Sequence, residues 1–214
     1  IAAHFSADDL AGKARCKRDL QDYFNLDADA DAPIVGMVTR LTDQKGLDLI
    51  EQAMERFMDR RMQFVMLGTG ERRYEQLFSW ACWRWPGRVG CWLEHNPPMA
   101  NRVYAGSDMF LMPSQFEPCG LAQLIALRYG SVPIVRETGG LRDSIAPYNK
   151  FTDEGLGFTF TFYDAGDMLG ALDRALETFF DYPASWQSLQ TRGMRAHFTW
   201  DKSARQYMDL YRSL

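Results

Sequence analysis

The chain has 214 residues, of which 46% are hydrophobic, 14% aromatic and 24% charged, and its formal net charge is −4. A chain of this length buries enough apolar surface to fold without a metal or a disulfide, and its acidic balance argues against general nucleic-acid binding. No apolar run approaches the roughly 18 residues that span a bilayer, and the early acidic residues are unlike a signal peptide, so neither a membrane segment nor a leader is expected.

The chain opens with a predicted helix followed by an acidic break. Ser6 to Asp9 offer a cap for a helix that runs through roughly Phe24, and the small and acidic run from Asp27 to Ala32 follows it. Four basic residues of this helix are most simply interpreted as a solvated face: Lys13, Arg15, Lys17 and Arg18. From Pro33 onward, short apolar runs alternate with longer amphipathic stretches.

The short apolar runs predict six strands, four of them continuous rather than alternating, as in strands covered on both faces. They lie at 34–38, 63–67, 88–93, 109–112, 132–135 and 157–162. Helical patterns occupy 47–60, 71–85, 100–104, 121–129 and 141–145, and a helical tail from about 164 contains patterns at 168–180, 184–197 and 202–214. This succession predicts one α/β domain over residues 1–214, a doubly wound, Rossmann-like parallel sheet.

Cysteine and histidine usage argues against a metal. Cys16, Cys82, Cys91 and Cys119 lie far apart with no Cys-x-x-Cys pair, which favours reduced thiols in a cytosolic protein over a zinc site or a disulfide framework. The chain has only three histidines, too few for a histidine-based zinc site. We therefore expect no metal and a cytoplasmic location, or a plastid if the source is a plant.

The turns after the first and fourth predicted strands carry candidate ligand-binding residues. A doubly wound sheet binds ligands beyond the carboxyl ends of its strands, where the strand order reverses. Arg40 and Lys45 follow the first strand, and this pairing of a guanidinium with an ammonium suits a diphosphate. Glu117 follows the fourth strand and is suited to accept sugar hydroxyls, while Gly120 lets backbone amides approach an anion.

A third turn, Thr138-Gly139-Gly140, follows the fifth strand and either cradles an anion or makes a tight turn. Each turn alone is more often structural: Arg40 and Lys45 as a solvated basic turn, Glu117 as a capping carboxylate. All three fall at strand carboxyl ends, so together they predict a site for a sugar that carries a diphosphate.

The motifs of other enzyme classes are incomplete or lacking in this sequence. Gly68-Thr69-Gly70 follows a strand, but Arg73 stands where a dinucleotide fingerprint needs its third glycine. A Walker loop and a serine nucleophile elbow are lacking. A glycoside hydrolase needs two opposed carboxylates, and the spacing of Glu117, Asp108 and Asp143 supports no pair.

A tryptophan cluster forms a further candidate site: Trp80, Trp83, Trp85 and Trp92. Indole rings stack on sugar faces, so a polysaccharide platform stays open. Packing in the core or against another domain is the preferred interpretation, because aromatic side chains in helices are usually buried.

The motifs resemble those of the bacterial glycogen synthases and plant starch synthases. The resemblance rests on Phe116-Glu117-Pro118-Cys119-Gly120-Leu121 with Tyr129-Gly130, Val132-Pro133-Ile134-Val135-Arg136 and Thr138-Gly139-Gly140-Leu141. Arg40-Leu41-Thr42, Gln44-Lys45-Gly46-Leu47, the opening Ser6-Ala7-Asp8-Asp9-Leu10 with Gly12-Lys13 and the closing Phe198-Thr199-Trp200-Asp201 belong to it as well. It covers essentially the whole chain, and the Glu-Pro-Cys-Gly-Leu block is specific.

The resemblance implies the two-domain GT-B fold, of which this chain is the carboxyl-terminal, nucleotide-sugar-binding half. It implies transfer of glucose from ADP-glucose, or UDP-glucose in some members, to the non-reducing end of an α-1,4-glucan, with retention and without a metal or other cofactor. The amino-terminal half, which carries the glucan acceptor groove, is missing from this chain. We therefore expect the chain alone to bind ADP-glucose weakly and to transfer no glucose.

The resemblance also implies roles for individual residues. Arg40 and Lys45 bind the diphosphate and stabilise the leaving nucleotide, and Glu117 holds hydroxyls of the donor glucose. Backbone amides that meet the sugar and phosphates belong to the turns after the fourth and fifth strands: Cys119, Gly120, Leu121, Thr138, Gly139 and Gly140. His95 corresponds to the aromatic residue that stacks on adenine.

The pattern departs from the family in the missing amino-terminal half and at Ile125, and two alternative functions stay open. Ile125 stands where many related enzymes have a second glutamate that clasps the ribose, so ribose recognition is unassigned. The first alternative is a non-catalytic module that binds a nucleotide or glucan, and the second is another nucleotide-sugar-dependent glycosyltransferase.

Overall fold

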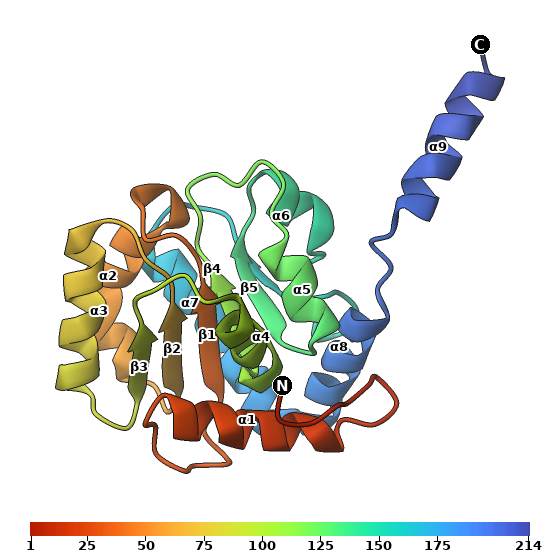
Figure 1. The fold of residues 1–214 in the computed structure, drawn as a ribbon. Helices are drawn as coiled ribbons and strands as arrows, with labels where there is room; N and C mark the ends of the chain where they lie inside the picture. The colour runs from red at the N-terminus through yellow and green to blue at the C-terminus, as the bar shows by residue number, and fades with distance from the viewer.

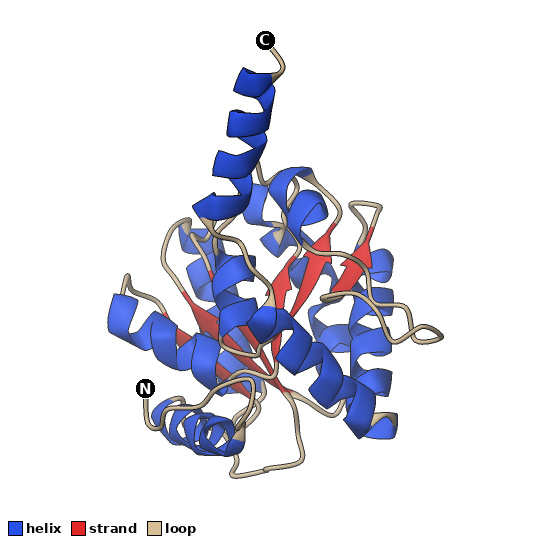
Figure 2. Cartoon of the chain, turned by 90° about the vertical axis from the view of Figure 1, so that its right-hand side faces the viewer, coloured by secondary structure: helices blue, strands red, loops and turns tan.

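The computed structural model describes the backbone of residues 1–214 and every side chain except that of Lys202. A six-stranded parallel sheet of order β3-β2-β1-β4-β5-β6 lies between two layers of helices (Figures 1 and 2). The strands are Ile34–Val38 (β1), Gln63–Leu67 (β2), Val89–Trp92 (β3), Met109–Met112 (β4), Val132–Arg136 (β5) and Phe158–Phe160 (β6). The strand order reverses between β1 and β4, as the Rossmann-like prediction requires.

The helices divide between the two faces of the sheet. One face is covered by α2 (Leu47–Met58), α3 (Arg72–Arg84), α7 (Ala165–Asp181) and α8 (Pro183–Arg195). The other face is covered by α1 (Ala11–Tyr23), α4 (Pro97–Gly106), α5 (Ala122–Arg128) and α6 (Gly139–Ser144). A 3₁₀ turn, η1 (Asp43–Lys45), precedes α2, and α9 (Trp200–Arg212) closes the chain.

The continuous apolar strands follow from burial on both sides. In β2, Phe64 and Met66 pack in the cluster beneath α2, α3 and α7, while Val65 and Leu67 pack in the cluster beneath α1 and α4. Successive side chains of a strand point to opposite faces, so a strand covered twice needs an apolar residue at every position. This is why such runs located the central strands at the correct residues.

The predicted element boundaries differ from the structure mainly at α4. The pattern predicted a helix over 100–104, but α4 begins at Pro97 because the Asn96 side chain accepts a hydrogen bond from the Met99 amide at 3.0 Å. Asparagine at the N-cap and proline at the first helical position both favour a helix start. The sixth strand is shorter than predicted and covers only Phe158–Phe160.

The solvated-face interpretation of α1 is wrong for two of its four basic residues. Lys13 and Lys17 are buried, whereas Arg15 and Arg18 are exposed. Lys13 Nζ donates hydrogen bonds to three backbone carbonyls, those of Ala105 (3.1 Å), Ser107 (2.8 Å) and Tyr129 (2.9 Å). These carbonyls lie at or just beyond the carboxyl ends of α4 and α5, where helices lack internal donors. Lys17 forms an ion pair with Asp108 at 2.9 Å.

For part of the tryptophan cluster, packing in the core of this domain is the wrong interpretation, while packing against another domain stays a prediction. Trp83 is 77% exposed and Trp80 is 40% exposed on α3, while Trp85 and Trp92 are half-buried. Trp80 and Trp85 contact each other edge to face, with ring centroids 5.3 Å apart. The outer surface of α3 therefore presents aromatic rings to solvent.

The predicted helical tail is not uniform. Helices α7 and α8 contribute Leu172, Trp186 and Leu189 to the core, whereas α9 projects away from the body (Figure 1). Aromatic and aliphatic residues of α9 and the chain end are exposed: Trp200, Tyr207, Met208, Leu210, Tyr211 and Leu214. In the part of the chain that the structure describes, no helix is both long enough and apolar enough to cross a membrane.

Candidate functional site

The turns after β1 and β4 pack backbone against backbone. Gly46 has a φ of 73°, and a Cβ there would lie 2.0 Å from the carbonyl oxygen of Pro113. The Gln115 amide donates a hydrogen bond to the carbonyl of Gln44 at 2.9 Å. Only glycine allows both this left-handed conformation and this approach, so the Gln-Lys-Gly sequence places Lys45 beside the second turn.

Lys45 and Glu117 form the charged centre of the site. Lys45 Nζ donates to Glu117 Oε2 at 2.6 Å, and the side chains are 16% and 10% exposed. Ser114 Oγ donates to the same carboxylate oxygen at 3.4 Å. Within the described residues, Glu117 Oε1 accepts no hydrogen bond, so this oxygen is available to a ligand hydroxyl.

The glycines after β5 bring the third turn against the second. A Cβ on Gly140 would lie 1.8 Å from the carbonyl oxygen of Cys119, and one on Gly139 would lie 2.3 Å from that of Glu117. The Gly140 amide donates a hydrogen bond to the backbone carbonyl of Glu117 at 2.9 Å, and the Thr138 amide donates one to the backbone carbonyl of Arg136. What the structure shows for Gly139 and Gly140 is therefore close packing against the second turn. The amides of Thr138 and Gly140 already have acceptors within the protein.

The turn before α5 presents three backbone amides in succession. The amides of Cys119, Gly120 and Leu121 donate to no acceptor among the described residues. Buried Gln123 holds the opposite side of this turn, because its Nε2 donates to the carbonyls of Cys119 at 3.2 Å and Gly120 at 3.0 Å. Oriented, unpaired amides of this kind attract anions.

A pocket of about 440 Å³ lies at the carboxyl ends of β1 and β2, and its lining does not include Lys45 or Glu117. It is lined from β1, β2 and the start of α4 by Arg40, Thr69, His95 and Asn96, with Asn101, Tyr104 and Ile125 among the remaining residues. The Arg40 side chain is exposed, and no hydrogen bond or ion pair engages its guanidinium within the described part of the chain. The structure therefore brings Arg40 and His95 into one cavity.

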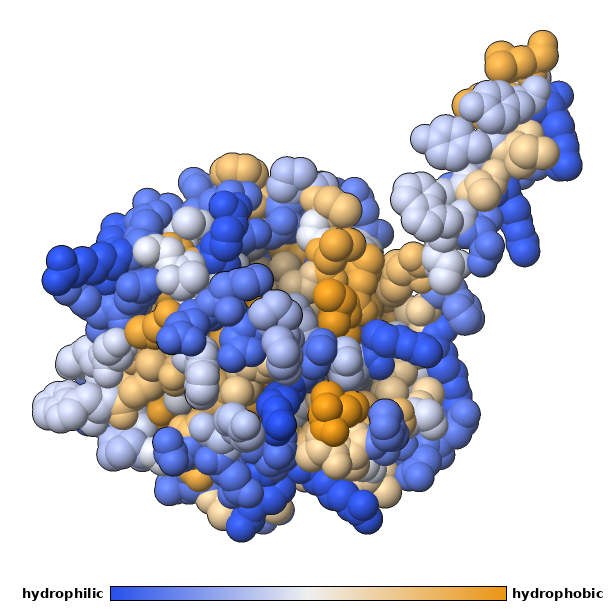
Figure 3. Space-filling model, viewed as in Figure 1, coloured by the Kyte–Doolittle hydropathy of each residue, from blue (hydrophilic) through white to orange (hydrophobic). Residues whose placement is uncertain are grey.

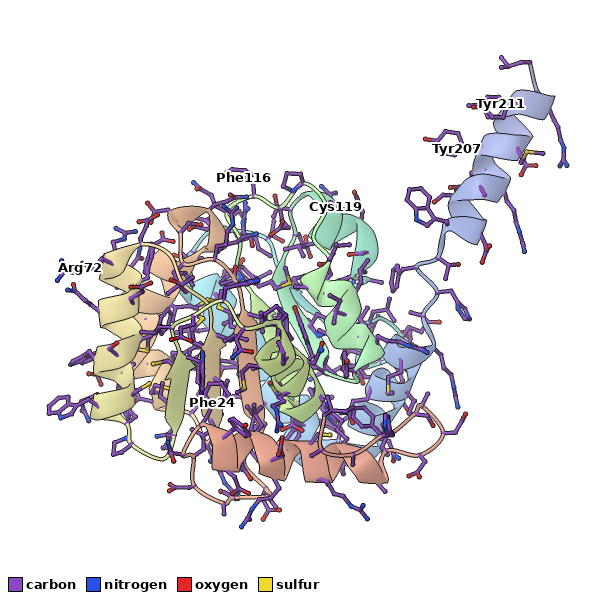
Figure 4. All side chains as sticks on the ribbon, in the orientation of Figure 1. Phe24, Arg72, Phe116, Cys119, Tyr207 and Tyr211 are labelled. Carbon is purple, nitrogen blue, oxygen red and sulfur yellow. The ribbon has the colours of Figure 1, made fainter. Side chains whose placement is uncertain are left out.

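The edge around this site is visible in two views. Phe116 and Cys119 lie beyond the carboxyl ends of the strands, whereas Phe24 lies near α1 (Figure 4). On the face shown in Figure 3, hydrophobic residues gather over α5, where Leu121 is 66% and Ile125 is 38% exposed. An apolar rim beside a charged centre is typical of a surface that another element covers.

The structure separates one pair of carboxylates named in the sequence. Asp108 precedes β4 and Glu117 follows it, so the two lie at opposite ends of the strand. Asp108 is occupied by Lys17 and by the Ile34 amide, each at 2.9 Å. Among the described residues, no group of three or more His, Cys, Asp or Glu side chains is arranged to hold a metal.

Sequence reasoning missed most of the pocket lining. The turns after β1 and β2 touch, since a Cβ on Gly68 would lie 1.8 Å from the Thr39 carbonyl oxygen. This contact places Thr39, Gly68 and Thr69 together in the pocket lining. The signal was present: Gly68 follows a strand adjacent to β1. The motif does not by itself predict this pocket, because it lacks the third glycine of a dinucleotide fingerprint. Tyr104 and Asn101 carry no comparable local signal.

This fold and site define a glycosyltransferase. Residues 21–186 match the family described as glycosyl transferases group 1, and the chain belongs to that family. The chain is 49% identical over 214 residues to a glycogen synthase of Bacillus cereus (strain Q1), covering 100% of this chain and 45% of that protein. It is 46% identical over 210 residues to a glycogen synthase of Clostridium novyi (strain NT), covering 98% of this chain and 44% of that protein.

A solved structure gives the same result. The catalytic domain of starch synthase IV from Arabidopsis thaliana, bound to ADP and acarbose, has a TM-score of 0.90 and 37% identity, and the match covers 100% of this chain and 45% of that one. The resemblance and the Rossmann-like GT-B fold predicted from the sequence are confirmed. The chain spans a little under half the length of these relatives.

Proposed function

We propose that this chain is the donor-binding domain of a glucosyltransferase that elongates an α-1,4-glucan. In this proposal, glucose moves from ADP-glucose, or UDP-glucose, to the non-reducing end of the glucan with retention of configuration. The relatives named glycogen synthase and the starch synthase bound to ADP and acarbose support the nucleotide and the glucan. No metal or cofactor is part of the proposal, and a cytoplasmic location stays a prediction.

The observation that carries the proposal is the contact between Lys45 and Glu117 beside three unpaired amides. A nucleotide sugar carries hydroxyls next to two phosphates, so its site needs a carboxylate acceptor next to cations and N–H donors. Glu117 Oε1 supplies the acceptor, Lys45 supplies the ammonium, and the amides of the turn before α5 supply the donors. As the bond to the leaving nucleotide breaks, the Lys45 ammonium and the amide N–H groups meet the developing negative charge.

The nucleoside belongs in the pocket of about 440 Å³ in this proposal. His95 stacks on the base, and the free guanidinium of Arg40 contacts the phosphates from the pocket side. Ile125 contributes apolar surface where related enzymes have a ribose-binding glutamate, so the ribose contacts come from other lining residues such as Asn101. Direct ligand contacts from Thr138, Gly139 and Gly140 stay predictions.

The acceptor groove belongs to the part of the longer relatives that this chain does not span. Exposed Leu121 and Ile125 beside the charged centre, and the stripe of Trp200, Tyr207 and Tyr211 on α9, are the surfaces we assign to that part. Tyr207 and Tyr211 project from the same side of α9 (Figure 4). Closure of two halves over the donor excludes water and aligns the acceptor.

Two measurements test the proposal. Titration calorimetry of the chain with ADP and ADP-glucose is expected to give weak binding, and radiolabelled ADP-glucose with glycogen is expected to give no incorporation by the chain alone. A donor panel of ADP-, UDP- and GDP-sugars sets the preference. Absence of binding to every nucleotide sugar contradicts the donor site, and glucan elongation by the chain alone contradicts the need for a second half.

A second candidate function, binding of glucan to α3, is favoured by the exposed rings of Trp80 and Trp83. Calorimetry with maltoheptaose distinguishes it, since a heat signal that disappears in Trp83→Ala and persists in Lys45→Ala identifies α3 as the glucan site. Equal signals in Trp83→Ala and the unmodified chain exclude it.

A further inference from the structure

Two cysteine thiols lie in contact outside the site described above. Cys82 Sγ, on α3, donates a hydrogen bond to Cys91 Sγ, on β3, across 3.0 Å. Both residues are half-buried and pack against the edge of the apolar core. Both sulfurs are free thiols in this structure.

Local structure explains why these residues meet. Cys91 and Val89 lie on the face of edge strand β3 that packs beneath α3, because they are two positions apart. The chain reverses direction between the two elements in a turn where the amides of Arg88 and Val89 donate to the Trp85 carbonyl at 3.1 and 3.0 Å. The turn and the strand therefore hold Cys91 opposite Cys82.

The other two cysteines have no such partner. Cys16 is buried, and its Sγ donates to the carbonyl of Ala3 at 3.3 Å. Cys119 is exposed in the turn before α5, with no sulfur within hydrogen-bonding distance among the described residues. An intramolecular disulfide therefore has one geometric solution in this chain.

We propose that Cys82 and Cys91 form a reversible dithiol–disulfide site that exchanges with low-molecular-weight disulfides. The Cys91 thiolate attacks one sulfur of such a disulfide and releases the first small thiolate, which leaves a mixed disulfide on Cys91. The Cys82 thiol then loses its proton, attacks Cys91 Sγ and releases the second small thiolate. Two protein thiols are oxidised, one disulfide is reduced to two thiols, and the two protons lost by the cysteines end on the released thiols.

The order of attack follows from the hydrogen bond. Donation from the Cys82 thiol lowers the pKa of Cys91, and the same hydrogen bond raises the pKa of Cys82. The thiolate is the reactive form, so Cys91 attacks first and Cys82 resolves the mixed disulfide. Bond formation then shortens the distance between the two sulfurs from 3.0 Å to about 2.05 Å.

The disulfide ties the edge strand to its covering helix next to the nucleoside pocket. The segment that leaves β3 carries Glu94, His95 and Asn96, which line that pocket. In a reducing compartment the dithiol form predominates, and the site responds to oxidation only transiently. The inference does not depend on the proposed function, because it concerns thiol chemistry alone.

Oxidised glutathione is the probe. After incubation with it and digestion with trypsin, mass spectrometry is expected to find peptides 74–84 and 89–102 joined and lacking two hydrogens. The oxidised chain is expected to melt about 5 °C higher than the reduced chain, with reversal by dithiothreitol. Cys119→Ser removes the exposed thiol and is expected to leave the joined peptides intact.

Single variants test the order of attack. Cys82→Ser leaves Cys91 without its resolving thiol, so a stable glutathione adduct on Cys91 is expected where the unmodified chain gives the joined peptides. In Cys91→Ser, Cys82 is expected to react with oxidised glutathione at least tenfold more slowly than Cys91 reacts in Cys82→Ser. The proposal is overturned if glutathione remains on either cysteine of the unmodified chain, or if both cysteines stay open to iodoacetamide after oxidation.

Discussion

The ammonium of Lys45 lies 2.6 Å from the carboxylate of Glu117, although 72 positions separate the two residues in the sequence. The contact joins the turn after β1 to the turn after β4, so the point where the strand order reverses is closed by an ion pair. Each of the two side chains is mostly buried, and each holds the other in place.

Lys45→Ala is expected to weaken ADP-glucose binding by about tenfold or more, because it removes a charge-assisted contact to the diphosphate and leaves Glu117 unneutralised. Titration calorimetry measures the affinity, and circular dichroism checks that the variant is folded. Lys150→Ala is the matched control, since Lys150 makes an exposed ion pair with Glu177 and is absent from the site. Equal affinity in Lys45→Ala and Lys150→Ala contradicts the assignment.

Gly140→Ala is expected to destabilise the fold by about 1–3 kcal/mol and to weaken ADP-glucose binding. The new methyl group would lie 1.8 Å from the Cys119 carbonyl oxygen, so the turn that carries the free amides must move. Gly170→Ala is the control, because a Cβ there approaches only Arg174, at 3.8 Å, and alanine is the better helix former. Urea unfolding and calorimetry are the measurements. A stable Gly140→Ala variant with unchanged affinity would show that this close packing does not shape the site.

His95→Ala is expected to lower the affinity for ADP by about five- to tenfold through the loss of ring stacking, whereas His95→Phe retains most of the affinity. Fluorescence competition with ADP measures both variants against His197→Ala, which changes an exposed histidine outside the pocket. Equal losses in the alanine and phenylalanine variants would point to a hydrogen bond rather than to stacking.

Lys13 gives a pH-dependent prediction. Burial lowers the pKa of Lys13 from 10.5 to about 8 in the folded chain, against a smaller raising effect of Asp108. Between these two pKa values the unfolded chain binds more protons than the folded chain, so the contribution of Lys13 to stability rises with pH. Urea unfolding measures the free energy of unfolding of the unmodified chain and of Lys13→Met. The value for the unmodified chain is expected to rise relative to that of Lys13→Met by on the order of 2 kcal/mol between about pH 7 and about pH 9.5. A constant difference across that range would contradict the lowered pKa.

The fold and the centre of the site could be predicted because their signals are local. Doubly covered strands leave continuous apolar runs, and ligand-binding turns at strand ends leave glycines and charges such as Gly46 and Lys45 at fixed places in the alternation. The placement of these residues is observed, while their roles in binding stay predictions.

The misplaced residues owe their positions to distant partners. Lys13 is buried because carbonyls at the ends of two other helices face it, and no pattern within α1 records those carbonyls. Trp83 is exposed because α3 packs through Tyr74, Phe78 and Ala81 instead. Cys82 and Cys91 meet only once α3 folds onto β3, so their spacing in the sequence gave no sign of a pair.

The close packing of Gly46, Gly139 and Gly140 against neighbouring carbonyls has a mechanical consequence. Three turns that are wedged backbone to backbone cannot fold down individually as flaps over a bound donor, because any one of them would carry the others with it. A donor that binds as proposed therefore meets a preshaped, stiff platform, and a closure over that donor moves the three turns as one unit.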